Sequence, residues 1–240
     1  MLSPLQLPVV HTLRALPSFV RLMRDPARLE HVFRLASTTA SSPVATRLLS
    51  DLRRDPQIAR ALTQRPRLGG VDLERLGALP LGSLGRTYVE FLQARHLRHE
   101  DLVLVDGDTD FHYFCNHLRE THDLWHVVTG FETDVAGELG LQAFYVAQLR
   151  APLGLVLLAV GMLNTAIDAL EDRDRRMSAI TRGWLLGKRA RPLFGVRWQE
   201  QWATPVEALR RRFGIDPPAV ERAVMAAVPP GGANDLAPQA

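Results

Sequence analysis

Two histidines, an aspartate and a glutamate between residues 122 and 138 form the most chemically distinctive group in this sequence. His122 and His126 are four residues apart, so on a helix both imidazoles leave from the same face. Asp123 would lie about 100° around the helix from His122 and roughly 60° from His126. Two neutral imidazoles with a carboxylate suit a divalent transition metal, and Zn²⁺ and Fe²⁺ are the leading choices.

Glu138 must reach this group from a second helix. It follows His126 by twelve residues, which is about 18 Å along one continuous helix and too far for a shared ion. Gly130 is a typical helix stop. We therefore expect the chain to reverse there and to return Glu138 on an antiparallel helix, with Gly137 permitting a close helix-helix approach.

These observations predict one site, and its proposed metal ligands and catalytic residues are His122, Asp123, His126 and Glu138. Histidine pairs at this spacing also arise by chance, so the spacing alone does not establish a metal. Whether Asp123 binds the ion or orients a histidine stays open. No residue is assigned to an organic cofactor. We expect the remaining histidines to be surface or core residues: His11, His31, His96, His99, His112 and His117.

The elements that must position this site are predicted to be helices. Ala and Leu are abundant and aromatic residues make up 7% of the chain, which favours helices over strands. We predict an all-α fold with one helical domain, residues 1–228, and a disordered tail, residues 229–240. Apolar spacing, caps and stops predict helices within 13–23, 25–37, 43–52, 55–66, 85–97, 111–128 and 134–150, then an apolar helix, a basic helix and a helix within 197–215.

Three alternating aspartates precede the histidine helix, namely Asp106, Asp108 and Asp110. This spacing is typical of a calcium-binding loop, but the twelfth position is His117 and not the required glutamate. We therefore interpret the segment as a helix start capped by Asp108 or Asp110.

The longest apolar run, residues 151–163, has thirteen residues and is too short to span a bilayer, which needs about 20. It predicts a buried helix or the wall of an apolar cavity. From Arg173 to Arg212 there are eleven basic residues against three acids. Such a stretch suits anionic lipid headgroups, acidic partners or an anionic substrate, although a solvated arginine-rich surface is an equal alternative.

Composition narrows the functional classes further. The net charge of +3 does not indicate nucleic acid. Cys115 is the only cysteine, which excludes a disulfide framework within the chain and favours a reducing compartment. The first residues resemble neither a signal peptide nor, convincingly, a mitochondrial transit segment, because the helical pattern continues into the body of the chain.

The full pattern, HDxxH followed by eleven residues and a glutamate, resembles the signature of the coenzyme Q biosynthesis protein 4 family. The resemblance covers about residues 20–215. It includes the segments "LRRDP", "QRPRL", "GSLGRTYVEFL", "LRETHDLWHVVTGF", "AGELGLQAF" and "RWQEQWATPVEALRRRFGI" in the family's order. All four residues of the metal motif are present.

This resemblance implies an all-helical fold, a divalent metal at His122, Asp123, His126 and Glu138, and an apolar cavity for a polyprenyl lipid. Zn²⁺ is the first choice of ion, and Fe²⁺ and Co²⁺ suit the same donors. The implied activity, of the lyase class, is oxidative decarboxylation at C1 of a 4-hydroxy-3-methoxy-5-polyprenylbenzoate. We expect the prenyl chain to contact the apolar helix 152–170 together with Phe144 and Tyr145.

The implied partners are an isoprenoid lipid, other ubiquinone-biosynthesis enzymes and a second copy of the chain. The expected location is the bacterial cytoplasm, peripheral on the inner membrane. Two alternatives stay open: a non-catalytic scaffold that binds prenylated lipids around a structural metal, and an HD-type phosphohydrolase. The phosphohydrolase is weakened because the chain offers no convincing separate His and Asp partners.

Overall fold

The computed structural model describes residues 43–99, 104, 106–150 and 152–227 of the 240-residue chain. The helices predicted within 13–23 and 25–37, and the tail predicted at 229–240, lie outside the described residues. In the described part the chain is helical, and the only β-type pairing there is a single bridge between Ser83 and Pro205. The predicted all-α fold with a single domain is confirmed.

The helices are, in chain order, α3 (Pro43–Leu52), α4 (Pro56–Gln64), α5 (Leu73–Gly77), α6 (Leu84–Ala94), α7 (Asp110–Thr129), α8 (Val135–Leu149), α9 (Pro152–Asp168), α10 (Arg173–Arg189), α11 (Val206–Phe213) and α12 (Pro217–Ala227), with the 3₁₀ turns η2 (Leu170–Asp172) and η3 (Trp198–Glu200).

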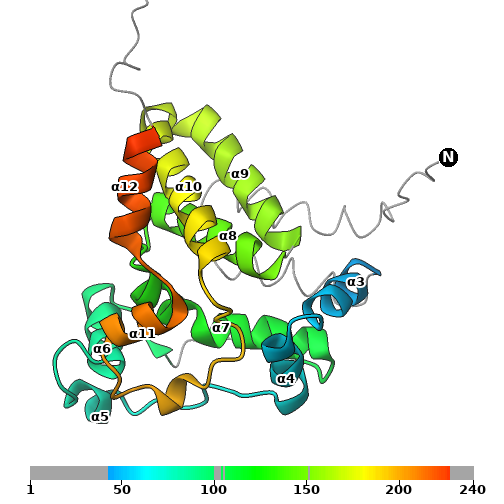
Figure 1. Cartoon of the computed structure of the whole chain (residues 1–240), viewed down its shortest axis with the longest axis vertical. Helices are drawn as coiled ribbons and strands as arrows, with labels where there is room; N and C mark the ends of the chain where they lie inside the picture. Colours follow the sequence, from blue (N-terminus) through cyan, green and yellow to red (C-terminus); the bar gives the residue numbers. More distant parts are fainter. Residues whose placement is uncertain (1–42, 100–103, 105, 151, 228–240) are drawn as a thin grey trace, which may run out of the picture.

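Two groups of helices meet at the junction between α7 and α8 (Figure 1). In the first group α7 contacts α3, α4, α6 and α11, and α5 packs on α6. In the second group α8 contacts α9 and α10, and α12 packs on α10. Helix α7 is the centre of the first group and α8 is central to the second, so the turn between them joins the two halves of the core.

The start of α7 differs from the prediction. Its N-cap is Thr109, whose hydroxyl accepts a hydrogen bond from the His112 amide while the His112 ring accepts from the Thr109 amide. Asp108 and Asp110 were predicted as caps, and that prediction was wrong. Their carboxylates accept hydrogen bonds from Arg65 instead, at 2.7 and 2.9 Å, which ties the loop before α7 to the end of α4.

Side-chain caps begin several other helices. Asp55 caps α4 with Pro56 at its first position, Ser83 caps α6, and Asp134 caps α8. Gly130 ends α7 in the left-handed region, at a φ of 78° that favours glycine.

Helices α8 and α10 are in contact backbone to backbone. A Cβ atom added at Gly183 of α10 would lie 1.9 Å from the Gly140 carbonyl oxygen of α8. One turn later, a Cβ at Gly187 would lie 2.8 Å from the Phe144 carbonyl oxygen. Only glycine permits an approach this close, so these positions fix α8 against α10.

The segment 197–215 was predicted to hold one helix, but it forms η3, a turn at residues 201–205 and α11. Two carbonyls of this turn accept hydrogen bonds from the start of α6: the Leu84 amide donates to the Thr204 carbonyl at 2.8 Å and the Gly85 amide to the Trp202 carbonyl at 2.9 Å. These bonds satisfy amides that a helix start leaves without partners. Helix α12, which follows α11, was not predicted from the sequence.

Helix α9 has one buried and one exposed apolar face. Its buried side packs on α8, where a Cβ at Gly161 would lie 2.2 Å from the Leu139 side chain. The exposed side carries Leu155, Val156, Met162, Leu163 and Ile167, and Leu170 of η2 and Met177 and Trp184 of α10 are exposed as well. Within the described residues, no helix combines the length and apolar character that crossing a membrane requires.

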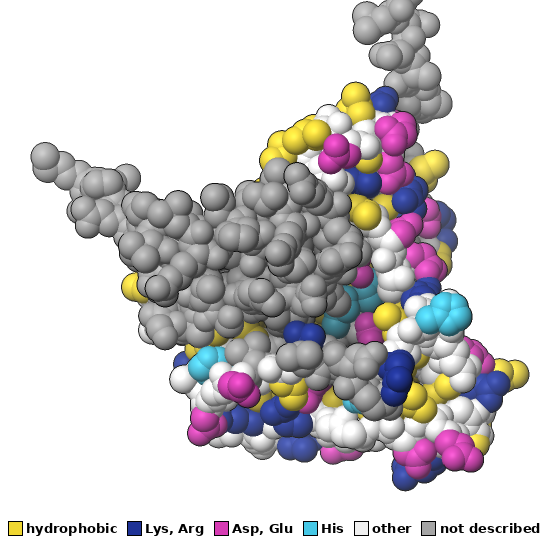
Figure 2. Space-filling model, turned by 180° about the vertical axis from the view of Figure 1, so that it is seen from behind, with side chains coloured by type: hydrophobic (Ala, Val, Ile, Leu, Met, Phe, Trp, Pro, Cys, Tyr) yellow, Lys and Arg dark blue, Asp and Glu magenta, His cyan; other side chains and the backbone are white. Residues whose placement is uncertain are grey.

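Several basic residues between Arg173 and Arg212 are paired within the fold. Arg176 is buried and donates to Asp172, and Arg175 pairs with both Asp172 and Asp134. Arg182 pairs with Glu221 and Arg210 with Glu207. Figure 2 shows acidic and basic side chains interspersed along the right-hand edge of the molecule. These pairs reduce the positive charge that the stretch presents to a partner.

Candidate metal centre

Two histidines and one glutamate meet where α7 ends and α8 begins. His122 and His126 lie on α7, and Glu138 lies in the first turn of α8. One donor atom from each residue lies within 4.8 Å of the other two, and all three side chains are buried. Among the described residues this is the only group of three or more such side chains with that geometry.

The turn between the helices creates this proximity. Gly130 ends α7, and the Asp134 side chain accepts a hydrogen bond from the Gly137 amide at 2.8 Å to start α8. Gly137 was predicted to permit a close helix-helix approach. In the structure a Cβ there would lie 1.9 Å from the Glu132 carbonyl oxygen, so the close approach is to the turn itself.

The donor atoms converge on a small volume. His126 Nε2 lies 3.1 Å from His122 Nε2 and 3.1 Å from Glu138 Oε1. His122 Nε2 lies 3.6 Å from the other carboxylate oxygen, Glu138 Oε2. Both imidazoles therefore direct the same nitrogen, Nε2, at the carboxylate.

The opposite nitrogens are held from behind. His126 Nδ1 lies 2.9 Å from the Phe131 carbonyl oxygen, and His122 Nδ1 lies 3.1 Å from the Tyr145 hydroxyl. Phe91 of α6 stacks on the His126 ring, with ring centres 5.8 Å apart. Such contacts fix the orientation of a histidine that binds a metal.

The group is electrostatically matched to a cation. Burial raises the pKa of Glu138, but the charges and hydrogen bonds of His122 and His126 outweigh it and hold that pKa at about 2. Burial lowers the pKa of His122, but the Glu138 carboxylate outweighs this effect and raises it. The buried carboxylate is thus ionised and needs a positive partner, which a protonated imidazole or a divalent cation supplies.

Asp123 was predicted to join these residues, and the structure does not place it among the three mutually close donors. Its side chain is partly exposed. Its charge is nevertheless close enough to help raise the pKa of His122, after the larger effects of burial and of Glu138. Asp123 therefore adds negative potential to the site from its edge.

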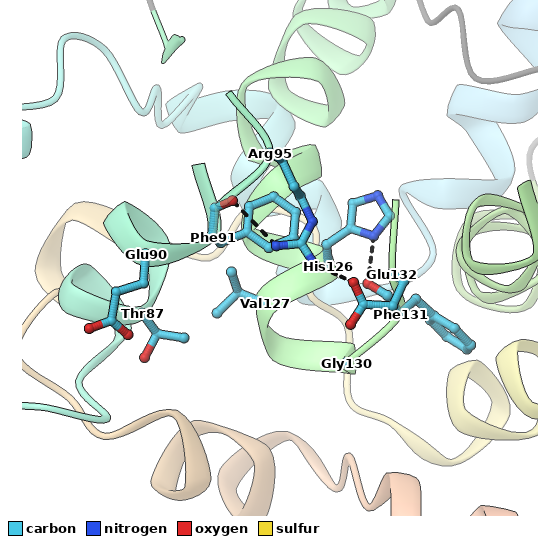
Figure 3. Close-up of a pocket in the computed structure, with 9 residues that line it drawn as sticks. All are labelled: Thr87, Glu90, Phe91, Arg95, His126, Val127, Gly130, Phe131 and Glu132. Atoms are coloured by element: carbon cyan, nitrogen blue, oxygen red, sulfur yellow. Dashed lines mark hydrogen bonds and ion pairs between the residues drawn. The ribbon is translucent and has the colours of Figure 1, made fainter. Parts of the chain in front are cut away.

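A cavity of about 310 Å³ lies against His126 and is lined by Thr87, Glu90, Phe91, Arg95, His126, Val127, Gly130, Phe131 and Glu132 (Figure 3). Arg95 lies over the Phe91 ring, 4.1 Å from its centre, and pairs with Glu132. His122 and Glu138 are not among the lining residues, so this cavity borders the back of the donor group.

The other histidines that the structure describes have separate roles. His117 is buried and bridges the Pro66 carbonyl and the Gly195 amide. His99 contacts the Tyr88 hydroxyl and the Gly69 carbonyl, and His112 completes the cap of α7. The expectation that they are surface or core residues fits these contacts.

Tyr145 was missed as a member of the site and was predicted instead to line a lipid cavity. A signal was present in the sequence, because Tyr145 follows Glu138 by seven residues, which is two helical turns on the same face of α8. Phe131 acts through its backbone carbonyl, and no side-chain pattern indicates such a contact.

Comparison with known proteins shows the family of the chain. Residues 5–219 match the family model described as coenzyme Q (ubiquinone) biosynthesis protein Coq4. The chain belongs to this Coq4 family. The family is named for ubiquinone biosynthesis, which places the chain in that pathway.

Relatives from distant organisms support the assignment. The mitochondrial Coq4 homologue of Danio rerio is 30% identical over 86% of this chain and 76% of its own length. The mitochondrial Coq4 protein of Yarrowia lipolytica is 32% identical over 81% of this chain and 75% of its own. A crystal structure from Nostoc punctiforme, of a protein assigned provisionally to ubiquinone biosynthesis, has a TM-score of 0.75 at 28% identity and covers 84% of this chain and 97% of that one.

Proposed function

We propose that this member of the Coq4 family performs the C1 step of ubiquinone biosynthesis. The substrate is a 4-hydroxy-3-methoxy-5-polyprenylbenzoate, and its carboxyl group leaves as carbon dioxide while a hydroxyl takes its place. The observation that carries the proposal is the buried group of His122, His126 and Glu138, whose donor atoms all lie within 4.8 Å of one another.

The donor set fits a divalent metal. Two imidazole nitrogens and one carboxylate oxygen suit Zn²⁺, Fe²⁺ or Co²⁺, with Zn²⁺ the first choice. Three protein donors leave a position for substrate, as catalytic sites require, whereas four donors would close the site. When bound, the ion would supply a Lewis acid for the substrate's carboxylate or ring oxygen.

The protein's own residues set the conditions for this chemistry. His122 and His126 present Nε2 atoms, and Glu138 supplies the negative charge that holds a cation in a buried place. Asp123 adds negative potential from the edge of the site. Because replacement of a carboxyl by a hydroxyl is a net oxidation, the reaction also takes an oxidant, and O₂ is the natural candidate.

The exposed apolar side of α9 supports a lipid contact for the prenyl chain and for the inner membrane. Leu155 and Ile167 are 57% and 64% exposed, in a row of apolar residues that water solvates poorly. A peripheral position on the inner membrane of a bacterial cell, next to other ubiquinone-biosynthesis enzymes and to a second copy of the chain, follows as part of the proposal.

The test is complementation of a mutant that lacks C1 decarboxylation. We expect wild type to restore ubiquinone and Glu138→Gln, which keeps the shape but removes the charge, to leave the carboxylated precursor to accumulate. Glu74→Gln is the matched control, because Glu74 is exposed on α5, outside both the donor group and the cavity beside His126. Full complementation by Glu138→Gln would overturn a catalytic site.

The exposed apolar residues of α9 and α10 also favour a second candidate, a scaffold that binds prenylated lipids and pathway enzymes. Elemental analysis of wild type and of alanine variants at His122, Asp123, His126 and Glu138 separates the two. Variants that lose the metal and still complement would show that the ion has a structural role and would favour the scaffold.

A further inference from the structure

The imidazoles of His122 and His126 each direct Nε2 at the donor group and Nδ1 away from it. The hydrogen-bond partner of Nδ1 decides which of the two nitrogens carries the proton. For His126 the partner is the Phe131 carbonyl oxygen, 2.9 Å from Nδ1. A carbonyl only accepts hydrogen bonds, so Nδ1 of His126 carries hydrogen. In the neutral ring the lone pair is then on Nε2 and points at Glu138.

His122 has a different kind of partner. Its Nδ1 lies 3.1 Å from the Tyr145 hydroxyl, which is able to donate or to accept. If the hydroxyl donates, the neutral ring carries its hydrogen on Nε2, and that atom is unable to bind an ion. If the hydroxyl accepts, Nδ1 carries the hydrogen and the Nε2 lone pair faces His126 and Glu138.

The position of Tyr145 is set by the helix that carries Glu138. Both residues lie on one face of α8, two turns apart. Glu138 contacts His126, and Tyr145 contacts His122, which is one turn earlier on α7. The two helices therefore pass each other in opposite directions, and α8 supplies a partner to each histidine in turn.

Packing leaves the Tyr145 ring little freedom. It is buried and stacks on Trp125, with ring centres 4.5 Å apart and planes 29° apart. The Tyr145 ring also lies nearly parallel to the His122 ring, with planes 14° apart and ring centres 6.0 Å apart. Trp125 is itself held by an edge contact with Phe144. The hydroxyl is thus aimed at His122 Nδ1 by aromatic contacts that do not depend on it.

We infer that Tyr145 is a positioning residue: its hydroxyl oxygen accepts a hydrogen bond from His122 Nδ1 and so holds that imidazole in the form and orientation that binds a divalent ion through Nε2. The inference rests on the proposed metal-dependent function. It assigns to α8 two roles in the site, a ligand at Glu138 and an orienting contact at Tyr145.

Tyr145→Phe isolates this role, because it keeps the stacking ring and removes one oxygen. We expect the affinity for Zn²⁺ and Co²⁺ to fall by about 10- to 100-fold, the usual effect of removing a contact that orients a metal-binding histidine. The absorption spectrum of the Co²⁺ form should change as well, because the His122 ring is no longer fixed. Affinity is measured by competition with a chromophoric chelator, on the full chain.

Tyr113→Phe is the matched control. Tyr113 is also buried, and its hydroxyl donates to the Pro66 carbonyl at 3.0 Å, away from the donor group. We expect its metal affinity to stay within about twofold of wild type. A Tyr145→Phe affinity that also stays within twofold would overturn the inference.

A measurement without metal separates this inference from the proposed function. In the metal-free protein at one fixed pH, ¹⁵N spectra of the histidine rings report which nitrogen of His122 carries hydrogen. We expect Nδ1 to be protonated in wild type and the signal to shift in Tyr145→Phe. Wild type that binds neither ion would refute the metal-dependent function, and an unchanged His122 signal would refute the role of Tyr145.

Discussion

The stability of the protein should depend on pH through His117, a buried histidine outside the donor group. Its Nδ1 lies 3.1 Å from the Pro66 carbonyl oxygen and its Nε2 accepts from the Gly195 amide at 3.0 Å. The carbonyl only accepts and the amide only donates, so both bonds require the neutral ring with hydrogen on Nδ1. A proton added at Nε2 would face the Gly195 N–H and break that bond.

The size of the effect follows from the pKa. Burial lowers the pKa of His117 from 6.5 to about 4, although the Pro66 contact opposes this shift. Below pH 6.5 the unfolded chain binds a proton that the folded chain does not, so stability falls as the pH falls. The contribution is complete above pH 6.5 and is lost at about pH 4. At about 1.36 kcal/mol for each pKa unit, the loss is about 3 kcal/mol.

The assay is urea unfolding, followed by circular dichroism between pH 7.5 and pH 4 in the presence of a chelator. We expect His117→Gln to destabilise the protein at pH 7.5, because it replaces the buried ring that bonds to Pro66 and Gly195. The glutamine side chain does not titrate. We also expect the variant's disadvantage relative to wild type to shrink by about 3 kcal/mol on going to pH 4. Carboxylates shared by both proteins cancel in this difference. His96→Gln, at an exposed position, is the control and should leave the pH dependence unchanged.

A free-energy difference between wild type and His117→Gln that stays constant from pH 7.5 to pH 4 would refute the reasoning. It would mean that the folded protein accepts a proton at His117 without losing the Gly195 contact. A parallel fall in both proteins would instead assign the acid sensitivity to groups other than His117.

Two further predictions concern the packing of the helices that carry the site. Gly183→Ala should lower the unfolding free energy, measured by thermal melts, by about 3 kcal/mol or more, because its Cβ would lie 1.9 Å from the Gly140 carbonyl oxygen. Ser178→Ala, on the exposed side of α10, is the control and should have little effect. Arg210→Met should lower the unfolding free energy in urea by about 1–2 kcal/mol, because Arg210 Nε donates at 2.8 Å to a carbonyl in the last turn of α7. Arg211→Met, on the same helix, should cost much less, and equal losses in the two variants would contradict a specific role for Arg210.

The arrangement of the donor group was largely predictable from the sequence. The four-residue spacing of His122 and His126 fixes their common face, and Gly130 fixes where α7 must end. The return of Glu138 then follows from the length of a helix that would otherwise carry it away. These are local properties, and local geometry is what a sequence pattern reports directly.

Two of the predictions failed because of contacts between residues far apart in the chain. Asp108 and Asp110 are reasonable caps by type, but Arg65 of α4 takes their carboxylates and leaves the cap to Thr109. The helix is interrupted before α11, where the Trp202 and Thr204 carbonyls accept hydrogen bonds from the first amides of α6. No pattern within one segment carries this information. The role of Asp123 stays a prediction, because its partly exposed side chain lies outside the three mutually close donors.

The glycine contact between α8 and α10 has a mechanical consequence. Helices whose backbones touch are unable to slide or tilt independently, because no side-chain layer between them is free to deform. A molecule that binds the exposed apolar residues of α10 and displaces that helix must therefore move α8 as well. Glu138 lies on α8 while His122 and His126 lie on α7, so such a displacement would change the spacing of the donor atoms. Occupation of the outer surface and the geometry of the buried donor group are thus linked through one rigid pair of helices.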